Sequence, residues 1–201
     1  MTRQHVTFAC GTFQLVGTID KAAGKTGLLI VTGGNETRAG AFSGQAELAA
    51  RIASAGFPTF RFDRRGVGDS EGENAGFRGS AADIAAAIAC FRENCPDVTA
   101  IVGFGNCDAA SALMLASGAG CDSLVLANPW TIEQDDASTP PDAVRARYAA
   151  KLRNPRELVR LLTGGVNLRK LAGGISRALR PAPPPSSLAR DMASGLAGFG
   201  G

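Results

Sequence analysis

The sequence contains few of the residues on which metal, redox and acid–base sites depend. Among 201 residues there is one histidine, His5, with one tryptophan and one tyrosine. The five cysteines are odd in number and include no C-x-x-C pair, so they predict neither a disulfide framework nor a zinc site. We therefore treat each cysteine as a free thiol, and we expect no metal and no cofactor.

Long apolar runs are also absent. No stretch reaches the roughly 18 residues of a membrane helix, and the N-terminal residues lack the charged, then apolar, then small-residue order of a secretion signal. We therefore expect no transmembrane segment and a cytoplasmic location. The chain is 45% apolar and has no internal repeat, which predicts one globular core.

Nucleotide-binding motifs are incomplete. The string "GKT" at Gly24 precedes a predicted strand rather than a helix, so it is not a P-loop. "GFGNCD" has the first two glycines of G-x-G-x-x-G, but Asp108 stands at the third glycine position. Its carboxylate would crowd and repel a pyrophosphate. We expect neither a dinucleotide nor a nucleic-acid partner.

Charge is unevenly distributed along the chain. Residues 145–190 carry 11 Lys or Arg against one acid, Glu157, whereas residues 1–144 carry 10 basic and 16 acidic side chains. A basic face attracts phosphates, acidic headgroups or acidic proteins. The alternative is a solvated helical face that keeps an amphipathic segment in solution.

Extended and helical patterns alternate up to Pro129. A hairpin turning at Gly11 is followed by an unbroken apolar run, "GLLIVTGGN", typical of a strand buried on both faces. We predict further strands in "FPTFRF", "TAIVGF" and "SLVLANP", with helices over residues 44–55, after Ser80 and after Cys107. Ser80 and Asp83 predict an N-terminal capping pair. This alternation predicts an α/β fold with a mostly parallel sheet.

A cysteine stands where the strand "TAIVGF" meets the next helix. Gly105 to Ala109, "GNCDA", match the nucleophile elbow G-x-S-x-G, with Cys107 for serine and alanine for the last glycine. Small flanking residues permit the strained turn, and the helix N-terminus would favour a thiolate. We predict Cys107 as the catalytic nucleophile; the alternative is a buried apolar side chain. The other four cysteines are predicted to be buried structural thiols: Cys10, Cys90, Cys95 and Cys121.

Acyl chemistry also needs donors for the oxygen that becomes negative in the transition state. The backbone amide of Asp108 supplies one predicted donor, and the loop "GGNE" supplies the other, through Asn35 beside Gly34. The alternative for this loop is an ordinary strand-to-helix turn.

The hairpin, "TGGN", "FDRRGVGDSEG" and "GFGNCDAAS", in this order and spacing, resemble the α/β-hydrolase fold. More narrowly, the elbow cysteine and "ANPW" resemble the exosortase A system-associated hydrolase of the first type, met near exopolysaccharide genes in bacteria with PEP-CTERM sorting. Dienelactone hydrolase is a more distant relative with an elbow cysteine. The resemblance implies hydrolysis and does not define the natural substrate. With the change of character after Pro129, the fold predicts three parts: 1–130 as the N-terminal part of the core, 131–180 as a helical lid, and 181–201 as a proline-rich segment returning toward missing core strands.

The catalytic triad departs from that family pattern. The acid and histidine of this fold follow the seventh and eighth strands, whereas this chain has only His5, which we expect to be exposed before the first strand. We expect the chain to be truncated and inactive or strongly impaired. The possible triad acids have no histidine to orient; they are Asp63, Asp69, Glu133, Asp135 and Asp136. Asp63 is predicted to brace its turn with Arg64 and Arg65.

The function that follows is hydrolysis of an ester or thioester through an S-acyl intermediate on Cys107. The expected partner is a small-molecule acyl substrate on an anionic carrier, such as a phosphopantetheine thioester or a lipid-linked phosphate. Two other classes stay open: a noncatalytic binding protein and a thiol redox protein. The sequence does not indicate an oligomeric state.

Overall fold

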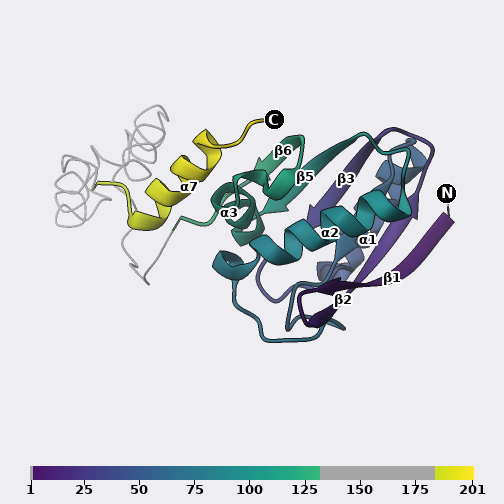
Figure 1. Cartoon of the computed structure of the whole chain (residues 1–201), viewed down its shortest axis with the longest axis horizontal. Helices are drawn as coiled ribbons and strands as arrows, with labels where there is room; N and C mark the ends of the chain where they lie inside the picture. The colour runs from purple at the N-terminus through teal and green to yellow at the C-terminus, as the bar shows by residue number, and fades with distance from the viewer. Residues whose placement is uncertain (1, 132–183) are drawn as a thin grey trace, which may run out of the picture. The chain divides into compact units, whose positions relative to one another are not determined.

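The computed structural model describes residues 2–131 and 184–201 (Figure 1). Contacts divide the chain into two units, of which the first consists of Met1–Thr131 and Ser187–Gly201 and the second of Ile132–Ser186. Only the first unit is described below. The predicted lid helices, between residues 132 and 180, lie outside the described residues.

The described residues form a sheet whose strand order is β1-β2-β4-β3-β5-β6. β1 and β2 form an antiparallel hairpin, and β2 also pairs antiparallel with β4. β4, β3, β5 and β6 run parallel to one another, which confirms the predicted mostly parallel sheet. The strands are β1 Thr2–Cys10, β2 Phe13–Lys21, β3 Thr26–Val31, β4 Thr59–Phe62, β5 Ala100–Asn106 and β6 Ser123–Ala127.

Helices pack on both faces of this sheet, because each parallel connection must return across a face. The longer helices are α1 Gly44–Ser54, α2 Ala81–Asn94, α3 Asp108–Leu115 and α7 Ser187–Ala197. Three short 3₁₀ turns are η1 Ala41–Ser43, η2 Phe77–Gly79 and η3 Ser117–Gly120. α2 and α3 contribute to the main apolar cluster, while the buried Ala49 and Ala53 of α1 lie apart from that cluster.

The main core is built on alternation along β4. Successive residues of a strand face opposite sides, so Phe60 and Phe62 face the α2 side while Thr59 and Arg61 face the other. The Phe60 ring lies 5.6 Å, centroid to centroid, from Phe91 of α2, and all four strand residues are buried. Burying such aromatic rings contributes about 2 kcal/mol each, which stabilises the packing of α2 on β4.

The C-terminal residues differ from the prediction. The prediction for residues 181–201 is a proline-rich segment returning toward core strands and includes no helix, whereas Ser187–Ala197 form the helix α7 and residues 198–201 form no strand. Leu188 and Met192, four residues apart on one helix face, are buried, and α7 contacts α3. No helix in the described ranges is long and apolar enough to cross a membrane.

The predicted capping pair at α2 is also wrong. The side chain of Ser80 makes no capping bond to α2; its hydroxyl donates to the Gly76 carbonyl at 2.9 Å. The Asp83 carboxylate accepts instead from Arg65 Nε at 2.5 Å. The charged partner across the turn therefore takes the carboxylate away from the helix end.

Candidate functional site

Cys107 lies in the sharp turn between β5 and α3. β5 runs between β3 and β6, ends at Asn106, and α3 begins at Asp108. The Cys107 backbone has φ 60° and ψ −127°, a conformation that costs a non-glycine residue about 1–3 kcal/mol. A Cβ at Gly105 would lie 2.7 Å from the backbone of Ala109, so the turn requires glycine there.

Hydrogen bonds from both sides hold this strained residue. The Cys107 N–H donates to Ala127 at the end of β6 at 3.0 Å, and the Cys107 carbonyl accepts from the N–H of Trp130 at 3.2 Å. The Ser111 hydroxyl donates to the Trp130 carbonyl at 2.7 Å. Strain of this kind persists only where the surroundings determine it, and here the segment after β6 does so.

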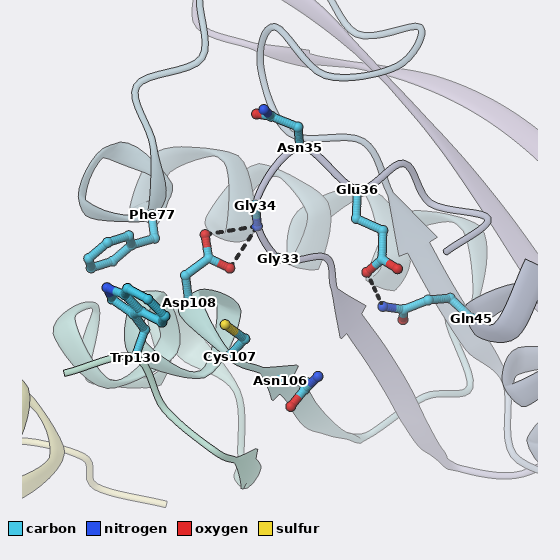
Figure 2. Close-up of a pocket in the computed structure, with 10 residues that line it drawn as sticks. All are labelled: Gly33, Gly34, Asn35, Glu36, Gln45, Phe77, Asn106, Cys107, Asp108 and Trp130. Atoms are coloured by element: carbon cyan, nitrogen blue, oxygen red, sulfur yellow. Dashed lines mark hydrogen bonds between the residues drawn. The ribbon is translucent and has the colours of Figure 1, made fainter. Parts of the chain in front are cut away.

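Cys107 faces a pocket of about 500 Å³. Figure 2 shows the rings of Phe77 and Trp130 together on one side of this pocket, with Glu36 and Gln45 on the opposite side. The described lining consists of Gly33, Gly34, Asn35, Glu36, Gln45, Phe77, Asn106, Cys107, Asp108 and Trp130. Apolar rings beside polar amides and a thiol suit a small organic ligand.

The predicted oxyanion residues meet in this pocket, with one unexpected bond. The Gly34 N–H donates to both oxygens of the Asp108 carboxylate, at 2.7 and 2.8 Å (Figure 2). The Gly34 amide is therefore occupied. Among the described residues, no backbone hydrogen bond uses the N–H of Asn35, and the N–H of Asp108 lies in the first turn of α3, where helix amides lack intrahelical partners. Their role as donors stays a prediction.

Arg64 was not predicted as part of the site. Its side chain is 2% exposed and lies under the loop after β3. Arg64 Nη2 donates to the Gly34 carbonyl at 2.5 Å and lies 3.7 Å from Asp108 Oδ2, while Nη1 donates to the Ser80 hydroxyl at 2.9 Å. Burial lowers the pKa of the Arg64 guanidinium, and the charges of Asp108 and Asp83 oppose this; an arginine stays protonated nevertheless.

Asp63 braces its turn, but not with the predicted arginines. Its carboxylate accepts from Arg38 Nη1, from the Arg38 N–H at 2.5 Å and from the Asp69 N–H at 3.2 Å. Asp69 also accepts from Arg38 Nη2 at 2.8 Å, whereas Arg65 pairs with Asp83. Among the described pocket-lining residues Asp63 and Asp69 do not occur. Glu133, Asp135 and Asp136 lie outside the described residues.

No histidine can reach Cys107. His5 lies within β1 rather than before it, is exposed as predicted, and its Nδ1 is 3.1 Å from Thr18 Oγ1. Three strands, β2, β4 and β3, separate β1 from β5 in the sheet. Because His5 is the only histidine of the sequence, Cys107 has no imidazole base in this chain.

The other four cysteines are buried, as predicted, and Cys107 alone is half-buried. Burial raises the pKa of the Cys90 and Cys121 thiols to about 11. It also raises the pKa of Cys95 and of Cys10, whose thiol donates to Asp83 as well. In residues 2–131 and 184–201 no cluster of His, Cys, Asp and Glu is arranged to hold a metal ion.

Comparison with known proteins identifies the fold. No family model matches the sequence, and no curated protein matches it. The structure is similar to an esterase, Pf2001 of Pyrococcus furiosus, with 15% identity over 97% of this chain and 66% of that one and a TM-score of 0.60. It is similar to the α/β hydrolase GrgF of Penicillium sp. sh18, with 18% identity over 98% and 73% and a TM-score of 0.58.

In other solved structures a smaller share of the chain is matched. A putative α/β hydrolase of Agrobacterium tumefaciens, ATU1826, matches with 20% identity over 67% of this chain and 64% of that one, at a TM-score of 0.54. The chain spans 51% of Pf2001 in a second crystal form and 54% of DcsB. At these identities the likeness establishes the fold alone: the described unit has the α/β-hydrolase fold, as the sequence predicted.

Proposed function

We propose that this protein is a hydrolase that cleaves an ester or thioester through Cys107. The observation that carries the proposal is the strained backbone of Cys107, at φ 60°, where a central parallel strand meets a helix beside a pocket. Natural proteins keep such strain mainly where it presents a reacting group. A cysteine needed only for packing could take an ordinary conformation.

The proposed reaction has two covalent steps. The thiolate of Cys107 attacks the carbonyl carbon, and the carbonyl oxygen becomes an oxyanion facing the N–H groups of Asp108 and Asn35. Collapse expels the alcohol or thiol, which takes a proton from water, and leaves an acyl group on sulfur. Water then adds to this thioester, releasing a carboxylic acid and the free thiol.

The second step should be the slower one in this chain. Hydrolysis of the S-acyl group needs a base to activate water, and no imidazole lies near Cys107. We therefore expect acylation without efficient turnover, so that the acyl-enzyme accumulates. A noncatalytic acyl-binding protein is the second candidate, because the same missing base would suit binding without hydrolysis.

The proposed substrate is a small acyl compound. Phe77 and Trp130 offer an apolar wall for an acyl chain, and the basic residues between 145 and 190 would suit an anionic carrier. The resemblance to the exosortase A system-associated hydrolase extends the proposal to exopolysaccharide-linked metabolism in the cytoplasm. That context is a hypothesis for the whole protein.

The test is single-turnover acylation with p-nitrophenyl butyrate. We expect one equivalent of nitrophenolate per chain, a single butyryl group on Cys107 by peptide mass spectrometry, and a rate at least about tenfold above free cysteine. Cys107→Ala should remove the adduct, whereas the matched control Cys95→Ala, at a buried thiol, should keep it. Saturable binding of the ester without an adduct would favour the noncatalytic alternative, and a reversible sulfenic acid on Cys107 without acylation would favour a redox protein.

A further inference from the structure

The loop after β3 contains a tight turn over residues 33–36. The N–H of Glu36 donates to the carbonyl of Gly33 at 3.0 Å, which closes the turn. Gly34 has φ +55°, while Asn35 is not among the residues with positive φ. Positive φ at the first central residue alone is the pattern of a type II′ turn.

The peptide between Gly34 and Asn35 is the part of this turn that can face either way. Types II′ and I′ differ by a flip of the central peptide, and type I′ would require positive φ at Asn35 as well. The flip exchanges the directions of the Gly34 carbonyl and the Asn35 N–H, since the two point to opposite sides of a trans peptide. Which way this peptide faces therefore decides whether the Asn35 N–H can serve the pocket.

Arg64 holds this peptide in one orientation. Its Nη2 donates to the Gly34 carbonyl at 2.5 Å, and its Nη1 is anchored on the Ser80 hydroxyl at 2.9 Å. The Asn35 N–H consequently points away from Arg64, and Asn35 lines the pocket. A charged donor on a carbonyl also polarises the amide, which strengthens the N–H at its other end.

The Asp108 carboxylate holds the preceding peptide. It accepts the Gly34 N–H with both oxygens, and Gly33 gives it room, because a Cβ there would lie 2.5 Å from Asp108 Oδ1. Arg64 Nη2, 3.7 Å from Asp108 Oδ2, balances the charge. With the Gly34 amide bonded to Asp108, the Asn35 N–H, which makes no backbone hydrogen bond among the described residues, is the donor on the far side of the peptide that Arg64 holds.

We propose that Arg64 is a positioning residue that directs the Asn35 N–H toward the substrate oxyanion. The inference rests on the proposed acyl chemistry at Cys107. Arg64 touches no substrate, being 2% exposed; it acts through the Gly34–Asn35 peptide, while Asp108 removes the Gly34 amide from competition. In this proposal the loop donor is the Asn35 amide, which a buried arginine orients.

Two reactions of the same thiol separate positioning from folding. Acylation by p-nitrophenyl butyrate passes through an oxyanion, whereas alkylation by iodoacetamide is a displacement at carbon that forms none. Arg64→Met removes both guanidinium bonds at similar volume, and should lower the acylation rate about tenfold or more while alkylation changes less than about twofold. Arg64→Lys should rescue acylation partly, because one ammonium can still reach the Gly34 carbonyl.

Arg65 provides the matched control. It follows the same strand, pairs with Asp83 and donates to the Gly79 carbonyl at 2.9 Å; neither partner belongs to the turn of residues 33–36. Arg65→Met should leave the acylation-to-alkylation ratio unchanged. If Arg64→Met fails to fold, Ser80→Ala, which removes only the anchor of Nη1, should lower that ratio by a few-fold.

The outcomes separate the two proposals. An unchanged ratio in Arg64→Met, or in Ser80→Ala where Arg64→Met does not fold, overturns the role of Arg64 while acylation of the unsubstituted protein still supports the hydrolase. An equal loss of both rates also overturns it, because the defect is then structural. Failure of the unsubstituted protein to acylate Cys107 overturns the proposed function and this inference with it.

Discussion

Two turns at the carboxyl edge of the sheet use their polar groups in opposite ways. In the β4 turn, residues 63–70, Asp63 accepts three hydrogen bonds from Arg38 and Asp69, and its carbonyl accepts the Ser70 hydroxyl at 2.7 Å. Ser70 in turn accepts from the Val16 N–H at 2.9 Å. This turn connects β4 to β2 and to the loop before α1. The polar groups named above all form hydrogen bonds within the protein.

The neighbouring β3 turn, residues 33–36, is also held by hydrogen bonds, but one of its backbone N–H groups, that of Asn35, is not used in them. Arg64 binds the carbonyl of its central peptide and Asp108 binds the N–H of the preceding peptide, while the Asn35 N–H makes no backbone hydrogen bond among the described residues. A catalytic site needs donors that are rigid before the substrate arrives and are not already bonded. The β4 turn therefore uses its polar groups for stability, and the β3 turn is the one to which the proposed function assigns a chemical role.

The largest contrast should appear among the thiols. Cys107, which lines the pocket, should react with iodoacetamide at pH 8 at least about 100-fold faster than Cys90 and Cys121. A thiol whose pKa is raised to about 11 by burial is only about 0.1% thiolate at pH 8, and the surrounding core excludes the reagent as well. Limited labelling followed by peptide mass spectrometry ranks all five cysteines.

The pH dependence of labelling provides a second test of the ranking of the cysteines. Between pH 8 and pH 10, labelling of Cys90 and Cys121 should rise about tenfold per pH unit, because the thiolate fraction rises toward the raised pKa. Uniform labelling of the five cysteines at pH 8, or Cys107 reacting last, would contradict the distinction between a thiol in the pocket and thiols in the core.

The second contrast is in stability. Asp63→Asn should lower the free energy of unfolding by about 3 kcal/mol, because the Arg38 guanidinium loses a buried partner and two backbone N–H donors face a weaker acceptor. Urea denaturation followed by circular dichroism measures this. Alkylation of Cys107 under native conditions should stay unchanged.

Asp69→Asn is the matched control for Asp63. Asp69 also bonds to Arg38, but its side chain is 69% exposed, and exposed pairs contribute less than about 1 kcal/mol. Equal losses in the two variants would show that burial does not decide the strength of the β4 turn.

Local patterns made most of the fold predictable. The apolar runs of β3 and β5, the Gly11 turn and the small residues around Cys107 each record a requirement of nearby backbone, such as the close approach of Gly105 to α3. The sharp turn at Cys107 was predictable because its motif consists of five consecutive residues, Gly105 to Ala109. The loop containing Gly34 and Asn35 was expected beside it because the α/β-hydrolase pattern places an oxyanion donor after the third strand.

Charge pairing was not predictable in the same way. Asp63, Arg64 and Arg65 are adjacent in sequence, yet each pairs with a distant residue: Asp63 with Arg38, Arg64 with the Gly34 carbonyl, and Arg65 with Asp83. After a strand ends, neighbouring side chains leave in different directions, and their partners depend on loops folded elsewhere. The helix α7 was missed for a related reason, since its buried Leu188 and Met192 are separated by polar and small residues and gain meaning only against α3.

The smallest contrast tests a single N–H in the β3 turn. Asn35→Pro removes that donor, and the second central position of a type II′ turn has the negative φ that proline requires. Asn35→Ala keeps the N–H and loses only the side chain, whose Oδ1 accepts from Asn74 Nδ2 at 2.8 Å. The proline variant should acylate Cys107 about tenfold more slowly than the alanine variant, with alkylation by iodoacetamide equal in the two and unfolding free energies within about 1 kcal/mol. Equal acylation rates in the two variants would mean that the β3 turn contributes no donor through Asn35. The β3 and β4 turns would then differ only in their distance from Cys107.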